Sequence, residues 1–148
     1  MPLRINDYVT SSRIVFIDAA DRQRAIDGLV DAADGAAGDM DAFREAVHER
    51  EQIVSTGIGL GVAVPHAKLP SISDFFVVIG ILRHEIDWDA IDQKPVRMVF
   101  LIGGPDDQQQ VYLQILSKIV LVTKSPKLRE RLLNARDVAD VEQAISDI

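Results

Sequence analysis

Apolar residues recur at two different spacings, which predict alternating strands and helices through the first third of the chain. A short β-branched and aromatic run over 14–17 predicts a strand. Apolar residues three and four positions apart predict a helix from about 21 to 33 and a second from 39 to about 53. Either Asp39 or Asp41 has the side chain to cap the second helix.

The middle of the chain is predicted to be extended. Segment 55–66 has glycine at 57, 59 and 61 and proline at 65, so it cannot form a helix. Two continuous apolar runs over 75–82 and 96–102 predict strands that are buried on both faces of a sheet.

The last third of the chain is predicted to be helical. An apolar face runs from about 108 to 123, and Ser125-Pro126 is a favourable start for a helix that reaches about 133. Asp137 can cap a final helix. We therefore expect one α/β domain over residues 1–148, with a mixed β-sheet flanked by helices and a helical C-terminal third.

The composition narrows the chemistry that the chain can carry. None of its 148 residues is cysteine, which excludes disulfides, thiolate catalysis and a cysteine zinc site. Its three histidines, His48, His66 and His84, lack the paired spacing of a metal site. We therefore expect neither a metal nor a cofactor.

The formal net charge of −7 argues against nucleic acid as a partner, because binding to phosphates needs a basic face. The charge could instead favour a basic protein partner or serve only solubility. The longest apolar run, 75–82, is far shorter than the ~20 residues that cross a bilayer, and segment 1–15 lacks the pattern of a signal peptide. We expect a cytoplasmic protein without membrane insertion.

His66 is the candidate reactive residue because of the segment that precedes it. Gly57, Gly59 and Gly61 leave one face of an extended segment without side chains, where a ligand or another backbone can approach closely. Pro65 fixes φ directly before His66, so the imidazole has a stiff support. Phosphoryl transfer depends mainly on such positioning. The alternative is a buried histidine that only satisfies the backbone.

Other functions of a glycine-rich segment do not fit this order of residues. The third glycine comes one residue too early for the dinucleotide-binding pattern G-x-G-x-x-G, and Val62-Ala63-Val64-Pro65 cannot begin a helix. The Gly-Lys-Ser/Thr ending of a P-loop and the G-x-S-x-G of a serine hydrolase are both absent from the sequence.

The sequence does resemble one known family. Arg50-Glu51 and the run from Ser55 to His66 are similar to the signature of phosphotransferase-system enzyme IIA domains of the fructose–mannitol type, which include the stand-alone nitrogen-regulatory IIA proteins. The likeness covers essentially the whole chain and continues through Asp87-Trp88, Lys94-Pro95-Val96 and Leu113-Gln114-Ile115-Leu116.

The resemblance implies roles for two residues. His66 matches the histidine that accepts phosphate from a phosphorylated histidine carrier protein, and Arg50 matches an arginine near that phosphate. The physical chemistry agrees, because a neutral imidazole is a competent nucleophile near pH 7 and a guanidinium can bind phosphoryl oxygens. Backbone N–H groups at Gly57, Gly59 and Gly61 could bind the same oxygens. For Arg50, an exposed charge at a helix end is the alternative.

Position 112 departs from the family pattern. Many members carry a second histidine there, beside the phosphorylated one, whereas this chain has Tyr112. A phenol can donate a hydrogen bond to phosphate or imidazole, but it carries no positive charge at neutral pH. Tyr112 is either part of the site or packed against the sheet. Lys68 could attract phosphate, although simple exposure is the more economical interpretation, as it is for His48 and His84.

Three functions are compatible with these residues. We favour a phosphocarrier that is loaded on His66 and has a regulatory role, binding target proteins according to its phosphorylation. We expect no permease segment to be attached to the domain, which would resemble the stand-alone nitrogen-regulatory proteins. The second possibility is a sugar-transport component that passes phosphate to a IIB domain. The third is a binding module that has lost transfer because Tyr112 replaces histidine.

Overall fold

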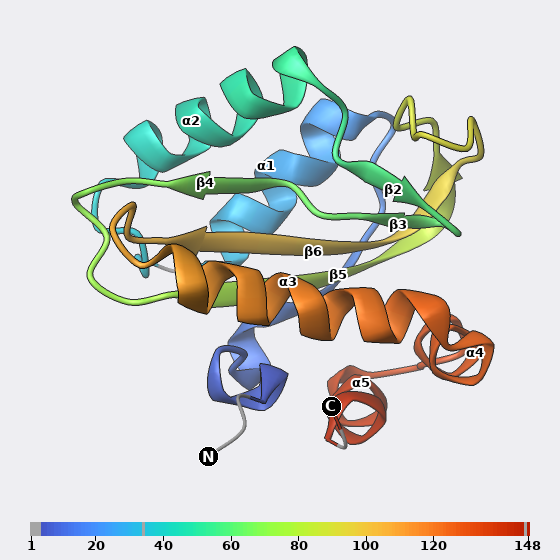
Figure 1. The fold of residues 1–148 in the computed structure, drawn as a ribbon. Coiled ribbons are helices and arrows are strands. Elements are labelled where there is room, and N and C mark those ends of the chain that lie inside the picture. The colour runs from blue at the N-terminus through green and yellow to red at the C-terminus, as the bar shows by residue number, and fades with distance from the viewer. Residues whose placement is uncertain (1–3, 34, 147) are drawn as a thin grey trace.

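The computed structural model describes residues 4–33, 35–146 and 148 and shows a mixed sheet between two groups of helices (Figure 1). Two short 3-10 turns, η1 (Ile5–Asp7) and η2 (Ser11–Arg13), precede the sheet. The strands of this described part are β1 (Ile14–Ile17), β2 (Gly57–Gly59), β3 (Val62–Ala63), β4 (His66–Lys68), β5 (Phe76–Ile86) and β6 (Val96–Gly104). Its α-helices are α1 (Arg22–Ala32), α2 (Met40–Ile53), α3 (Gln109–Lys124), α4 (Pro126–Leu133) and α5 (Val138–Ile145).

Strand β6 is central to the sheet because it pairs along both of its edges. The strand order is β1-β5-β6-β3-β2, and β4 also pairs with β6. β1 is parallel to β5, and both β3 and β4 are parallel to β6. β5 is antiparallel to β6, as β2 is to β3. Within the described ranges β4 therefore has β6 as its single strand partner, and its other edge is free of strands.

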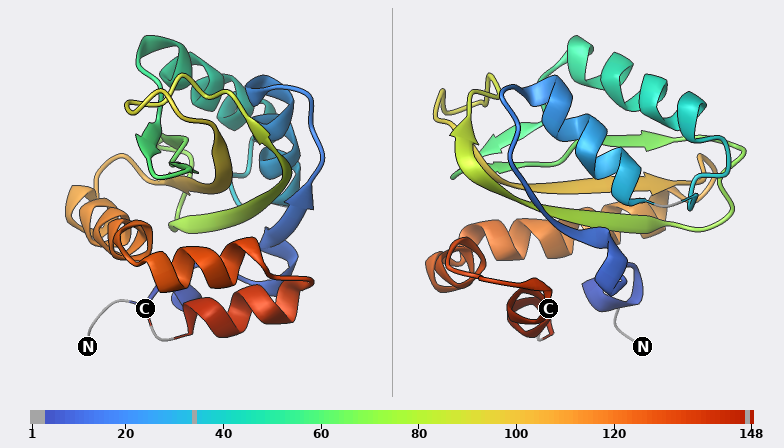
Figure 2. Two further views of the ribbon diagram at one scale, coloured as in Figure 1. Left: turned by 90° about the vertical axis from the view of Figure 1, so that its right-hand side faces the viewer. Right: turned by 180° about the vertical axis from the view of Figure 1, so that it is seen from behind.

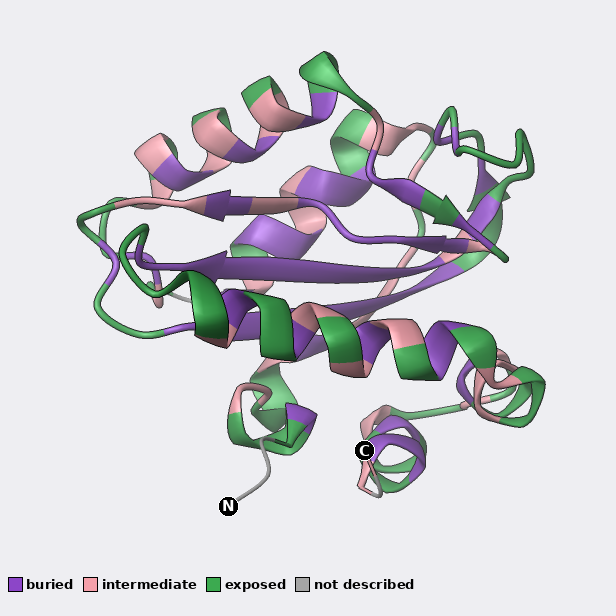
Figure 3. Cartoon of the chain, viewed as in Figure 1, coloured by how far each residue is buried: buried purple, intermediate pink, exposed green. Residues whose placement is uncertain are grey.

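Both faces of β6 and of β5 over 76–82 are largely buried, which explains the apolar sequence of these two stretches. Successive side chains point to opposite faces of the sheet. Val77 and Phe100 join the core beneath α3, α4 and α5, whereas Val78 and Leu101 join the core beneath α1 and α2. Figure 3 shows the resulting buried band through the sheet and along the inner sides of the helices.

The helices cover the sheet in two groups, which separate clearly when the molecule is turned (Figure 2). Four of the helices begin at a side chain that accepts a backbone N–H, as expected for N-caps. These caps are Asp21, Asp39, Ser125 and Asp137. In the described part of the chain, no helix is both long enough and apolar enough to cross a membrane.

The predicted fold class is confirmed, with one mixed sheet, flanking helices and a helical last third. Asp39, and not Asp41, caps α2. β5 continues four residues beyond its predicted end, to Ile86, because Ile86 pairs with Val96 at the start of β6. The glycine-rich segment 55–66 forms β2, β3 and the first residue of β4.

Candidate functional site

His66 lies at the edge of the sheet, between the two groups of helices. It is the first residue of β4, where its Cα pairs with that of Ile102 on β6. α2 lies on one side of β4 and α3 on the other (Figure 1). Ala67 joins the core beneath α1 and α2, so the alternation along β4 turns His66 and Lys68 towards α3. The edge position leaves the imidazole half-buried.

The backbone before His66 fixes the orientation of its ring. His66 Nδ1 lies 3.0 Å from the carbonyl oxygen of Val64. A carbonyl oxygen can only accept, so Nδ1 carries the proton and Nε2 keeps a free electron pair. The support is itself held to the sheet, because the Pro65 carbonyl accepts the Ile102 N–H at 3.0 Å and Val64 donates to the Thr56 carbonyl at 3.0 Å.

The surroundings favour the neutral imidazole. Burial lowers the pKa of His66 below its ordinary value of 6.5, and the positive charges of Arg50 and Lys68 lower the pKa further. The hydrogen bond to Val64 and the charge of Glu51 act in the opposite direction and only reduce the shift. At neutral pH the ring therefore presents an unprotonated nitrogen, as a nucleophile requires.

Arg50 reaches the same site from the last turn of α2. Its Nη1 donates to the Val54 carbonyl at 2.9 Å, which satisfies one of the carbonyls at the end of this helix. Among the described residues no carboxylate lies within 4.0 Å of the Arg50 guanidinium. A guanidinium has five N–H donors. Arg50 therefore retains donors for a ligand.

Tyr112 faces His66 from α3. The centroids of the two rings are 5.5 Å apart, and their planes are inclined at 46°. The Tyr112 side chain is 7% exposed, and burial raises the pKa of its phenol above 10.0. Tyr112 is therefore both packed in the core and part of the wall beside His66, and its hydroxyl stays protonated near neutral pH.

The structure brings Arg50, His66 and Tyr112 to one cavity of about 220 Å³. The rest of its wall is formed by Ser55, Thr56, Ile58, Val64 and Leu116. Arg50 and His66 also line a second cavity, of about 330 Å³, together with Ala46, Ala67 and Lys68. The three side chains predicted for the site thus meet, although they come from three elements far apart in the sequence.

Glu51 is a site-supporting residue that the sequence did not single out. It is 4% exposed, and its carboxylate accepts the Thr56 backbone N–H at 2.6 Å and the Thr56 hydroxyl. Trp88 Nε1 donates to the same carboxylate at 3.3 Å, and Arg22 Nη1 lies 3.9 Å from it. Glu51 thereby fixes the segment that leads from α2 to the wall of the His66 cavity.

The three glycines have structural reasons of their own. A Cβ at Gly57 would come within 2.6 Å of the Cβ of Ala90. Gly59 and Gly61 have φ of 97° and 80°, which turns the chain between β2 and β3. None of the three lines either cavity at His66 in the part that the structure describes. Phosphate binding by their N–H groups stays a prediction.

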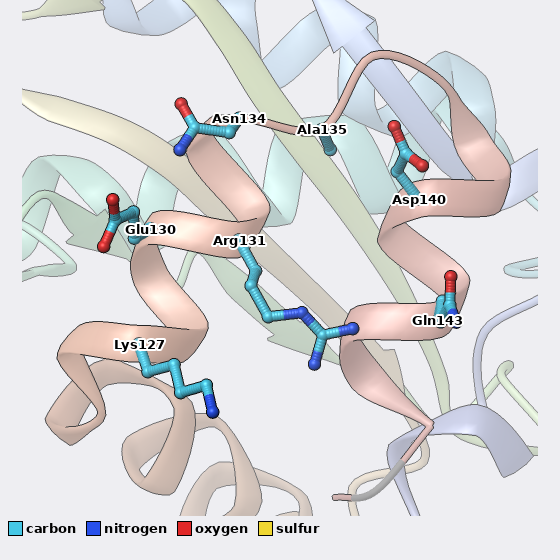
Figure 4. A pocket seen from close by; sticks show the side chains of 7 residues that line it. All are labelled: Lys127, Glu130, Arg131, Asn134, Ala135, Asp140 and Gln143. Carbon is cyan, nitrogen blue, oxygen red and sulfur yellow. The ribbon is translucent and has the colours of Figure 1, made fainter.

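A groove away from His66 lacks a comparable reactive side chain. Figure 4 shows a groove between α4 and α5, with Lys127 and Arg131 on one wall and Asp140 and Gln143 on the other. These side chains are exposed, their charges are of both signs, and the groove contains no histidine. No group of three or more metal-binding side chains occurs among the described residues.

Comparison with known proteins gives one family and two kinds of relative. The family model for the phosphoenolpyruvate-dependent sugar phosphotransferase system, EIIA 2, matches residues 8–148. The fructose-specific EIIA component of Haloferax volcanii is 34% identical over 131 residues, which cover 87% of this chain and 85% of that protein. The nitrogen regulatory protein of Bradyrhizobium diazoefficiens is 30% identical over 105 residues, which cover 71% of this chain and 69% of that protein.

A longer relative shows that this kind of domain also occurs within larger chains. The fructose-specific EIIABC component of Bacillus subtilis is 31% identical over 149 residues. The match covers 99% of this chain but 23% of that protein.

Solved structures support the fold. The crystal structure of nitrogen regulatory protein IIA-Ntr from Neisseria meningitidis superposes with a TM-score of 0.87 at 24% identity, covering 95% of this chain and 98% of that one. The enzyme IIA mannitol of Escherichia coli, in its complex with phosphorylated enzyme IIB mannitol, gives a TM-score of 0.81 at 17% identity. This match covers 95% of our chain and 98% of the matched chain.

Proposed function

The chain belongs to the EIIA 2 family of the phosphoenolpyruvate-dependent sugar phosphotransferase system, and from that premise we propose that His66 accepts a phosphoryl group from a phosphohistidine of another protein. The observation that carries the proposal is the hydrogen bond from His66 Nδ1 to the Val64 carbonyl. This bond leaves Nε2 as the nitrogen with a free electron pair, on a half-buried ring whose lowered pKa keeps it neutral.

The transfer exchanges one N–P bond for another. The electron pair of His66 Nε2 attacks phosphorus, and the N–P bond of the donor histidine breaks with its electrons returning to the donor nitrogen. The His66 ring keeps its Nδ1 proton, and a donor ring that is protonated on its other nitrogen leaves as neutral imidazole. Charge and protons balance without a further acid or base, so the transfer is reversible.

Arg50 stabilises the phosphoryl group during this exchange. Its guanidinium lines both cavities beside His66 and retains donors that no described carboxylate occupies. Hydrogen bonds from a charged donor to phosphoryl oxygens are stronger than neutral ones, and they are strongest where water is excluded. Phosphate binding by the N–H groups of Gly57, Gly59 and Gly61 stays a prediction, and the Gly57 N–H already donates to Ser55 Oγ at 3.2 Å.

The surface around the site suits a protein donor. Ile58 on the wall of the His66 cavity also borders a hollow of about 540 Å³ beside the end of α2. Ile53 and Ile91 at this hollow are 76% and 82% exposed, and Leu113 next to Tyr112 is 51% exposed. Exposed apolar side chains gathered around a reactive group favour docking of a protein surface. We assign the donor as a phosphorylated histidine carrier protein.

A phosphorylated His66 is compatible with two biological roles. In sugar transport the phosphoryl group passes to a IIB domain, the protein with which the mannitol enzyme IIA of Escherichia coli is seen in complex. In regulation, the loaded state itself changes which proteins bind. A phosphoryl group adds about two negative charges, and here it would do so beside the exposed apolar side chains. We favour regulation, the role named for the relative from Bradyrhizobium diazoefficiens.

Loading is tested with phosphoenolpyruvate, enzyme I and the histidine carrier protein, followed by intact-mass measurement. The wild-type chain gains the mass of one phosphoryl group and His66→Gln gains none. His84→Gln is the matched control, because His84 is exposed on β5 and stays outside the site. A wild-type chain that stays unmodified while an established family member is labelled would overturn the proposal.

The output is tested by mixing and by capture. A phosphorylated chain that loses its phosphoryl group to a fructose- or mannitol-type IIB domain supports transport. Different sets of bound proteins for His66→Ala, His66→Asp and phosphorylated wild type support regulation, and identical sets for all three count against it. Tyr112→His addresses the third possibility, because a large gain in loading would indicate that the tyrosine impairs transfer.

A further inference from the structure

Lys68 is held against α3, although its sequence position suggests a simply exposed charge. Its Nζ lies 4.3 Å from the centroid of the Tyr112 ring. The same ammonium donates a hydrogen bond to Gln109 Oε1 at 2.6 Å. The Lys68 side chain is half-buried between these two residues and the edge of the sheet.

The two partners of Lys68 form one platform on the first turns of α3. Gln109 and Tyr112 are three residues apart, so they are neighbours on the surface of the helix. An ammonium over the face of an aromatic ring is attracted by the ring's quadrupole, and a hydrogen bond on the same group fixes its direction. The platform therefore restricts an otherwise flexible four-carbon side chain.

This arrangement places a second positive charge at the cavity of His66. Lys68, Arg50 and His66 line the same cavity of about 330 Å³. Arg50 comes from α2 and Lys68 from β4 beneath α3, so the two cations approach the ring from different elements. Both charges are close enough to influence the protonation of His66.

We propose that Lys68 is a second phosphate-binding cation, and that Tyr112 acts through its ring, together with Gln109, to position the Lys68 ammonium beside the phosphoryl group on His66. This inference rests on the proposed function of His66. A phenol cannot supply positive charge at neutral pH, whereas its ring can hold a lysine that does. The departure at position 112 is then compensated within the site by Lys68, with the ring of Tyr112 as its support.

The test compares phosphorylation rates of variants with two donors. Phosphoramidate, a small chemical donor, reports on the site without a partner, and the phosphorylated histidine carrier reports on the complete reaction. Lys68→Met slows phosphorylation about tenfold with both donors, the effect of one lost charge-assisted hydrogen bond. Lys68→Arg restores part of the rate, and Lys124→Met, a change to an exposed lysine at the end of α3, is the matched control.

The role of the Tyr112 ring has its own signature. Tyr112→Leu slows the reaction as much as Lys68→Met, and the double variant is no slower than either single variant, because the two residues act as a unit. Tyr112→Phe, which keeps the ring, loses less than about threefold on the same reasoning. NMR titration of the imidazole adds a readout that packing alone would not move: Lys68→Met raises the pKa of His66.

Each contrary result has a distinct meaning. A wild-type rate for Lys68→Met, or a Tyr112→Phe as slow as Tyr112→Leu, would overturn the inference, the latter because the hydroxyl would then be the active group. If the carrier protein fails to load wild type while phosphoramidate labels His66, the proposed donor is wrong and the Lys68 comparison still holds. Failure of both donors would overturn both proposals.

Discussion

Arg50 and Glu51 are adjacent at the end of α2, yet the structure uses them in opposite ways. Glu51 is 4% exposed and is contacted by Thr56, Trp88 and Arg22. Arg50 is half-buried, and its one partner among the described residues is the Val54 carbonyl. The Glu51 carboxylate is bound by several donors inside the fold, whereas the Arg50 guanidinium, within the described residues, keeps most of its donors unpaired at a cavity.

The difference separates a residue that supports the site from one that acts in it. A buried carboxylate with several donors fixes the backbone around it, because moving any partner leaves an unsatisfied polar group. A cation with unused donors contributes little to folding and is available to a ligand. We therefore expect changes at Glu51 to appear in stability and changes at Arg50 to appear in transfer.

The largest expected effect is on folding. Glu51→Ala leaves the Trp88 indole N–H and the Thr56 N–H and hydroxyl unsatisfied, so the free energy of unfolding falls by about 3–5 kcal/mol. Urea denaturation followed by circular dichroism measures the change. Glu49→Ala, two residues earlier on the exposed side of α2, is the control and leaves stability within ~0.5 kcal/mol. Equal free energies of unfolding for the two variants would show that Glu51 does not support the fold.

The next effect is on transfer. Arg50→Gln slows phosphorylation of His66 about 100-fold, equivalent to ~2.7 kcal/mol of lost stabilisation of the phosphoryl group in the transition state. Its free energy of unfolding changes by less than ~1 kcal/mol, because it gives up a single hydrogen bond. Rapid-quench kinetics with the carrier protein gives the rate, and Arg24→Gln on the exposed side of α1 is the control. A variant that unfolds easily but transfers normally would reverse the assignment.

The smallest effect is on protonation. NMR titration of the His66 imidazole has its midpoint below 6.5 in the wild type, because burial and the charge of Arg50 lower the pKa. Arg50→Gln moves the midpoint up, towards 6.5. The unfolded chain binds this proton at higher pH than the folded one, so the His66 contribution makes the protein less stable as pH falls below 6.5. A wild-type midpoint above 6.5 would contradict the electrostatic description of the site.

Much of this fold was predictable because the periodic apolar residues are the ones that the sheet and helices bury. The starts of α4 and α5 agree with the sequence prediction, because Ser125 and Asp137 cap their N-termini. The end of β5 was not predicted, because exposed and charged residues at 83–85 interrupt the apolar run, and pairing with β6 extends the strand through them.

The site was only partly predictable. The family resemblance led us to expect Arg50 and Tyr112 near His66, and the structure places all three at one cavity. The comparisons confirm the family itself. Glu51 was named only as part of the family signature and was given no role, because its donor at Trp88 is 37 residues away. His48 was likewise expected to be a solvated surface residue, but its Nε2 lies 2.8 Å from Asp27 Oδ1 of α1. Local patterns do not reveal partners that only the tertiary fold supplies.

The contact of His66 with the Val64 carbonyl has a consequence for repeated turnover. A peptide oxygen has no protonation equilibrium in the physiological range, unlike the carboxylate that often orients a catalytic imidazole. We therefore expect the ring direction to be independent of pH while the protein is folded, and to be the same with and without a phosphoryl group. Each cycle of receiving and releasing phosphate would then proceed without turning the ring, and no free energy would be spent on reorienting the imidazole between the two half-reactions.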